Sequence, residues 1–129
     1  MKIIMFSAFL VFSVSAYGYE EFNSGEYEPV GYAVNDTIAI DYTVSYDPGT
    51  HVDLLEGGEI NGAVYSYNNG KFTLNGGSVS GRVLAHDNSK IYIKNGSIAY
   101  PDGNIFFTYE DSLIEFHGSD FRVDGTAVG

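Results

Sequence analysis

The sequence contains no cysteine and no tryptophan, and only three of its 129 residues are proline. Without cysteine the chain can form neither a disulfide framework nor a thiolate metal site. Its fold must therefore be stabilised by buried apolar surface and by hydrogen bonds. Glycine, by contrast, occurs 16 times, well above the ~7% average, which predicts many turns.

Basic residues are also scarce, since six Lys and Arg stand against 17 Asp and Glu, for a formal charge of −11. No basic residue occurs between Lys2 and Lys71, whereas ten acidic residues lie between Glu20 and Glu59. Nucleic acids and anionic membranes select basic patches, so this distribution argues against both as partners. The uneven charge also predicts head-to-tail self-association, in which the acidic first half of one copy meets the second half of another.

Long apolar runs are absent, apart from the twelve residues "IIMFSAFLVFSV" that follow Met1-Lys2. This run is too short to span a bilayer, and small residues follow it up to Ala16. Charge, length and ending together are typical of a secretory signal peptide. We therefore predict a signal peptide over residues 1–16, cleavage near Ala16, and a mature chain without a membrane span. The mature protein is expected outside the cell or on the cell surface.

Tyrosine and phenylalanine are abundant in what remains, with 11 and 9 copies. Residues 17–36 are acidic and rich in tyrosine, and we interpret them as an N-terminal arm or cap. The next segment, "TIAIDYTVSYD" at 37–47, alternates apolar and smaller or polar residues. This period of two predicts a half-buried strand, which Pro48-Gly49 would close with a turn.

From residue 52 onward the chain repeats itself. Residues 52–70 align with residues 71–89 and are identical at six of nineteen positions. A third copy begins at Lys90 and, after a four-residue insertion, resumes at Ile105. A fourth begins at Leu113. The identical pairs are Leu55/Leu74, Gly57/Gly76, Gly58/Gly77, Gly62/Gly81, Val64/Val83 and Asn69/Asn88.

Short strands joined by glycine corners at a period of about 19 residues are typical of a β-solenoid. The predicted fold is all-β, a single-stranded parallel β-helix of three to five coils over residues 37–129. An antiparallel β-sandwich remains the alternative, because four Asn-Gly pairs would each suit a hairpin. Hairpins do not explain the recurrence at one offset. The predicted inward columns are Leu55/Leu74/Ile93/Phe116, Ile60/Val79/Ile98/Phe121, Val64/Val83/Phe106 and Ser66/Ala85/Thr108.

The stretch "VDLLEGGEINGAVYSYNNGKFTLNGGSVSG" resembles the repeats of secreted bacterial β-helix proteins. Such repeats occur in pectate-lyase-like enzymes, in autotransporter adhesin passengers and in surface proteins with a PEP-CTERM tail. The resemblance covers about residues 34–129 and implies a structural or adhesive module, or else a member or remnant of a polysaccharide lyase or hydrolase family. The anchors of these families do not occur in the printed sequence, which implies a released protein or a shortened member.

The carboxylates do not converge as a glycosidase or lyase site requires, so we predict no enzyme and no catalytic residues. One oxygen-rich column at the polar turn is a candidate calcium site, and no other cofactor is predicted. Asn and Asp at stacked turns also cap their own backbone, which is the competing interpretation. The three histidines fall in different columns, which argues against zinc. The calcium candidates are Asn68, Asp87, Asn88, Glu110 and Asp111.

Two outward columns are aromatic, and they are the candidate binding residues. If Val64 and Ser66 point inward, Tyr65 aligns with Leu84 and Phe107, and Tyr67 aligns with His86 and Tyr109. Stacked aromatic side chains can bind sugars or pack against a partner, so a polysaccharide or another cell-envelope component is the expected ligand. The alternative is that the rings stabilise the solenoid, at about 0.2–1 kcal/mol a pair. The binding candidates are Tyr65, Tyr67, His86, Phe107 and Tyr109.

Overall fold

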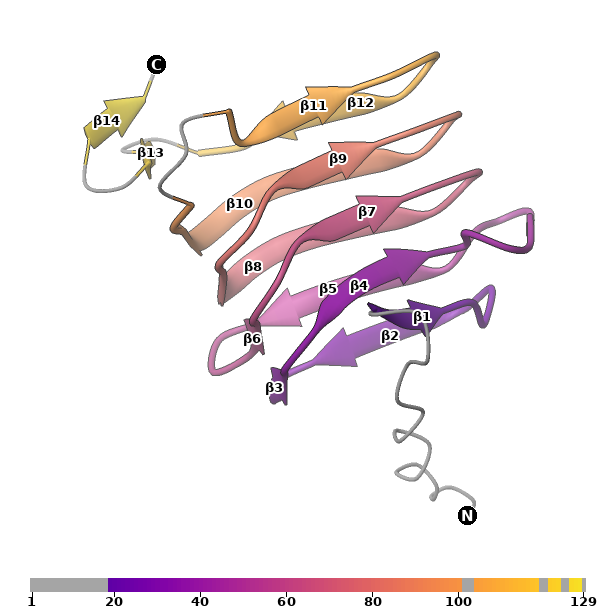
Figure 1. Ribbon diagram of the computed structural model, residues 1–129, viewed down its shortest axis with the longest axis horizontal. Helices are drawn as coiled ribbons and strands as arrows, with labels where there is room; N and C mark the ends of the chain where they lie inside the picture. The colour runs from indigo at the N-terminus through magenta and orange to yellow at the C-terminus, as the bar shows by residue number, and fades with distance from the viewer. Residues whose placement is uncertain (1–18, 101–103, 119–120, 124–125, 129) are drawn as a thin grey trace.

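The computed structural model describes residues 19–100, 104–118, 121–123 and 126–128, and the predicted signal peptide lies outside this part. The described chain is all-β and forms a β-solenoid of about five turns with about 20 residues per turn (Figure 1). The predicted fold class is therefore confirmed. Within the same residues, no helix has the length and apolar character to cross a membrane.

Two parallel sheets make up the solenoid, and the chain passes from one to the other in every coil. The five-stranded sheet has the order β1 (Tyr19–Phe22), β4 (Thr37–Ile40), β7 (Val64–Ser66), β9 (Val83–Ala85), β11 (Phe106–Thr108). The seven-stranded sheet has the order β12 (Leu113–Phe116), β10 (Lys90–Ile98), β8 (Lys71–Val79), β5 (His51–Leu55), β2 (Tyr27–Val30), with β3 (Ala33–Val34) and β6 (Glu59–Ile60) beside it. Every pairing in both sheets is parallel, which excludes the antiparallel sandwich.

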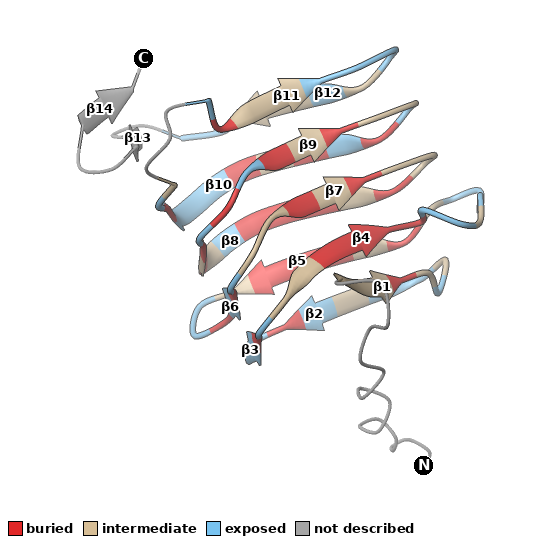
Figure 2. Cartoon of the chain, viewed as in Figure 1, coloured by how far each residue is buried: buried red, intermediate tan, exposed pale blue. Residues whose placement is uncertain are grey.

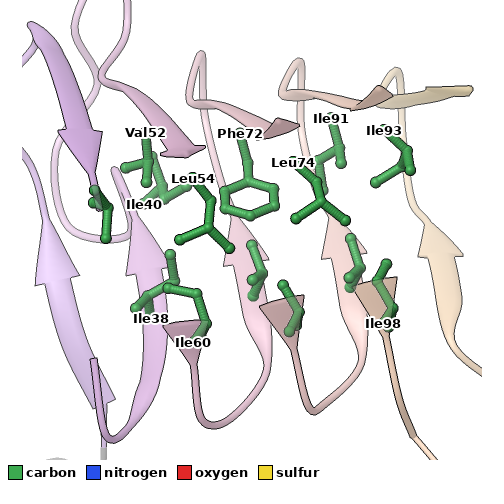
Figure 3. Close-up of a cluster of buried hydrophobic side chains, with 14 of the residues drawn as sticks. Ile38, Ile40, Val52, Leu54, Ile60, Phe72, Leu74, Ile91, Ile93 and Ile98 are labelled. Atoms are coloured by element: carbon green, nitrogen blue, oxygen red, sulfur yellow. The ribbon is translucent and has the colours of Figure 1, made fainter. Parts of the chain in front are cut away.

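The hydrophobic core lies between the two sheets, and its side chains form columns along the solenoid (Figure 3). Buried residues follow the strands, whereas exposed residues gather at the turns and corners (Figure 2). Because parallel strands pair at one spacing, each inward side chain stacks on its equivalent in the next coil. The columns in register include Ile60/Val79/Ile98, Val64/Val83/Phe106 and Ser66/Ala85/Thr108, as predicted.

The first inward column differs from the prediction by one residue, since Leu54 and not Leu55 pairs with Leu74. Leu54 is fully buried, and Leu55 is only partly buried. The pairing becomes irregular at the next residue, because Leu55 lies opposite both Asn75 and Gly76. The offset between the two coils is 20 residues up to Leu54 and Leu74 and 19 residues from Glu59 and Ser78, so the corner of the second coil contains one residue more than the corner of the third. Phe116 continues this column in register but is exposed.

The strand predicted over residues 37–47 ends at Ile40, because the next residue turns the chain. Asp41 has a φ of 54°, and its buried carboxylate accepts hydrogen bonds from the Thr50 backbone N–H at 2.9 Å and its hydroxyl at 2.6 Å. Residues 41–50 form a loop that protrudes from the turn edge of the solenoid (Figure 1). The strand prediction is therefore wrong for residues 41–47. They lie in a loop whose two ends are joined by the Asp41–Thr50 hydrogen bonds, and Tyr42 and Tyr46 are exposed in it.

The predicted fourth copy also departs from the repeat after Phe116. β13 (Phe121–Val123) pairs antiparallel with β14 (Thr126–Val128), so Phe121 does not continue the Ile98 column. The sequence between these strands is Asp124-Gly125, a dipeptide that favours two-residue hairpins. The predicted repeat therefore does not continue into β13.

The first coil is made by the acidic segment, whose described part supplies β1, β2 and β3 in parallel register with the next coil. Two inward positions of this coil hold carboxylates, because Glu20 pairs with Ile38 and Glu28 with Val52. Burial, and then the nearby Asp36, raises the pKa of Glu20. Inward charges oppose the addition of another strand at a sheet edge. Head-to-tail association would cover these carboxylates, and it stays a prediction.

The paired glycines lie at the corners of the second and third coils, as the repeat predicted, and Gly96 lies at the corner of the fourth. Gly57, Gly76 and Gly96 have φ angles of 91°, 117° and 126°, in the left-handed region that side chains disfavour. The second glycine of a pair has a different role, because a Cβ on Gly77 would lie 2.6 Å from the backbone oxygen of Gly58. The first glycine turns the chain and the second admits the neighbouring coil.

Candidate functional site

The outer face of the five-stranded sheet carries the first predicted aromatic column. Tyr65, Leu84 and Phe107 pair in register across β7, β9 and β11, and all three are partly buried. Arg82 lies beside them, with its guanidinium carbon 5.4 Å from the ring centroid of Tyr100 and 5.6 Å from that of Phe107. Its Nε also donates a hydrogen bond to the Tyr100 hydroxyl at 3.1 Å. We call Tyr65, Leu84 and Phe107, together with the ring ladder described next, the aromatic face.

The second column is a ladder of stacked rings. Tyr67 and His86 lie 4.7 Å apart with ring planes within 10°, and His86 and Tyr109 lie 4.6 Å apart within 9°. Tyr42 extends the ladder at 4.7 Å and Tyr19 at 5.9 Å beyond it, so five rings follow one another. Burial, and then Tyr42, raises the pKa of Tyr67. Because stacked rings cover one another's faces, this ladder fits the stabilising interpretation.

The aromatic face is nearly free of charge. Strand residues whose side chains point outward alternate with the buried ones. Among the outward-pointing residues of the five strands of this sheet, only Glu21 is charged, and it lies on the edge strand β1. The outward strand residues are Tyr19, Glu21, Thr37, Ala39, Tyr65, Leu84 and Phe107.

The polar turn brings three of the calcium candidates together as backbone caps. Asn68, Asp87 and Glu110 share a left-handed conformation, with φ of 55°, 61° and 58°. The Asn68 N–H donates to Asp87 Oδ2 at 2.9 Å, and the Asp87 N–H donates to Glu110 Oε1 at 3.0 Å. Each carboxylate thus caps a backbone N–H in the turn of the preceding coil, whereas the competing interpretation expected it to cap its own backbone.

The other two calcium candidates add no carboxylate to this set. Asn88 donates its backbone N–H to the Asn68 oxygen at 3.0 Å, and Asp111 is exposed. Across the part of the chain that the structure describes, no group of three or more His, Asp or Glu side chains is placed to hold a metal ion.

A polar cluster on the outer face of the seven-stranded sheet was missed from the sequence. The Tyr27 hydroxyl donates to Asp53 Oδ2 at 2.5 Å, and His51 Nε2 lies 2.8 Å from Thr73 Oγ1. The hydrogen bond to Asp53 is the main reason that the pKa of Tyr27 is raised. Asp53 is only 8% exposed, and its Oδ1 has no hydrogen-bond partner among the described residues. The side chains meet because β2, β5 and β8 are neighbours in this sheet.

The cluster contains the hydroxyl, imidazole and carboxylate of a nucleophilic site, but the geometry does not present them as one. Thr73 is 4% exposed, so a substrate carbonyl or sugar could not reach its hydroxyl without a rearrangement. The Asp53 carboxylate accepts from Tyr27, and no hydrogen bond joins it to His51 among the described residues. We interpret this cluster as cross-strand stabilisation.

His51 gives a prediction for the pH dependence of stability. Burial, and next the charge of Lys71, lowers its pKa, so the unfolded chain binds this proton more readily than the folded one. The stabilisation by neutral His51 is therefore present above its usual pKa of ~6.5 and is lost as pH falls below it. Urea unfolding from about pH 7.5 to about pH 5.5 should show this loss, and His51→Gln should flatten the profile. An unchanged slope in His51→Gln would contradict the assignment.

Comparison with protein-family models finds no match to this chain, and comparisons with curated proteins and with solved structures find none either. The structure supports the β-helix part of the resemblance seen in the repeats.

Proposed function

We propose that this chain is a secreted, non-catalytic interaction module that contacts polysaccharide through its aromatic face. The observation that carries the proposal is the uncharged, aromatic outer surface of β7, β9 and β11 in a chain of formal charge −11. An apolar surface of this kind, bordered by polar groups, is typical of binding faces.

The geometry of Tyr65 and Phe107 suits the apolar faces of sugar rings. They lie two strands apart, about 9.6 Å at the usual spacing, with Leu84 between them. Ladder rings cover one another, whereas no ring of the described residues stacks on Tyr65. Arg82 at the border offers N–H groups to sugar hydroxyls.

Secretion is supported by the charge, apolar run and ending of residues 1–16. A non-catalytic role is supported by the carboxylates, because Asp87 and Glu110 cap turns and Asp53 binds Tyr27. A bacterial cell surface as the site of action is what the repeat resemblance implies.

Sedimentation with insoluble polysaccharides tests the proposal. The mature chain should be retained by at least one of cellulose, chitin and peptidoglycan, and Tyr65→Ala and Phe107→Ala should each weaken retention about three- to tenfold. Tyr32→Ala is the matched control, because Tyr32 is an exposed tyrosine of the first coil. Failure to bind all three polymers, or equal loss in Tyr32→Ala, would overturn the proposal.

Catalysis is measured on the same samples. Soluble acidic polysaccharides incubated with the chain should yield no reducing ends and no unsaturated ends. Release of either that is lost in His51→Gln would contradict the non-catalytic role and would point to the cluster around Asp53.

A further inference from the structure

Two lysines lie directly opposite each other on the outer face of the seven-stranded sheet. Lys71 of β8 pairs in register with Lys90 of β10, so both side chains leave the sheet on the same face. Their backbones are about 4.8 Å apart, the usual spacing of neighbouring strands. Like charges in this arrangement destabilise a sheet. The chain has only six basic residues, and it places two of them here.

Neither lysine of this pair forms an ion pair within the described part of the chain. Among the described residues one ion pair occurs, between His117 and Glu115. The neighbouring column contains Asp53, whose Oδ2 already accepts from the Tyr27 hydroxyl. The lysines therefore form a positive spot, bordered along their own column by His51 and by the exposed Leu113.

We propose that Lys71 and Lys90 bind a phosphate monoester group on a polysaccharide. A phosphate monoester carries about −1.5 to −2 charges at neutral pH and three acceptor oxygens, which matches two ammonium groups. A carboxylate or a phosphodiester carries one charge and leaves one lysine uncompensated. His51 adds no charge at neutral pH. The column therefore offers two positive charges, which match one phosphate monoester. Tyr92, two residues from Lys90 on the same face, supplies a ring for the sugar.

The negative charge of the rest of the protein sharpens this selection. Nucleic acid presents many phosphodiesters, which the excess of 17 acidic over six basic residues repels. An isolated phosphate on an otherwise neutral polymer meets this repulsion only once. The proposal uses the sheet face opposite the aromatic face, so the two functions can fail separately.

The test uses Lys90→Glu, which places an opposite charge across from Lys71. It should abolish phosphate binding and at the same time raise the urea midpoint, since an attractive cross-strand pair replaces a repulsive one. These opposite changes separate a lost site from a damaged fold. Lys94→Glu is the matched control, because it makes the same charge change on the same strand outside the pair, and it should retain most of the binding.

Mannose 6-phosphate is the probe, followed by NMR titration and compared with mannose, mannose 6-sulfate, glucuronate and a dinucleotide. The phosphate ester should bind at least about tenfold more tightly than the others at pH 7.5, where it carries most of its second charge. Equal affinity for the sulfate, preference for the dinucleotide, or unchanged binding in Lys90→Glu would overturn the proposal. Retained phosphate binding without retention on neutral polymers would overturn only the proposed function.

Discussion

Replacing Gly77 with alanine should destabilise the solenoid more than any surface substitution. A Cβ at this position would lie 2.6 Å from the Gly58 oxygen, 2.7 Å from Leu54 Cγ and 2.9 Å from the Leu55 oxygen. Two of these atoms belong to the backbone and cannot rotate away, so neighbouring coils must separate. We expect a loss of about 3 kcal/mol in the free energy of unfolding, measured by urea denaturation.

Gly31→Ala is the control for this experiment. A Cβ on Gly31 would meet no atom within 4 Å, so the same chemical change should alter stability by no more than about 0.5 kcal/mol. Equal losses in the two variants would show that glycine acts through general flexibility of the chain. A loss confined to Gly77→Ala would locate the requirement at the contact between coils.

Leu54→Ala should be the second large loss, at about 2–5 kcal/mol, because it empties a fully buried position between Val30 and Leu74. Leu55→Ala removes the same atoms from the next residue, which is only partly buried, and should cost less than about 1.5 kcal/mol. Urea midpoints of the two variants measure the difference directly.

This pair of variants also decides the register of the second coil. If Leu55→Ala were the more damaging change, Leu55 would occupy the inward column and the irregular pairing at Asn75 would be wrong. Both side chains are leucine and adjacent, so neither composition nor propensity can account for a difference between them.

Most of the fold could be predicted because its determinants are local and repeated. Glycine pairs mark the corners, and a period of two within each short strand assigns inward and outward positions. The register of Leu54 could not be predicted, since the corner of the second coil contains one residue more than that of the third, which leaves the pattern on either side unchanged. The end of β4 at Ile40 depends on the buried Asp41 carboxylate, a tertiary interaction that alternation does not report.

The aromatic columns followed from the same alternation, and the structure places their members in register. The full ladder could not be predicted in this way. By the register of β4 and β7, Asp41 is the position equivalent to Tyr67, and Tyr42 is one residue beyond it, although its ring still reaches Tyr67. The cluster around Asp53 was missed for a related reason. An offset of 19 residues puts Val52 opposite Lys71, whereas the structure puts His51 there.

The equivalence of Lys71 and Lys90 has a consequence for how such a chain can change. Residues 71–89 begin and end at matching points of successive coils, so this stretch is a complete exchangeable unit. Duplicating it would leave both ends of the stack unaltered while adding one leucine and one histidine to the aromatic face and one lysine to the opposite face. Valency, and with it avidity for a repeating polymer, could thus be adjusted by gene duplication without designing a new contact.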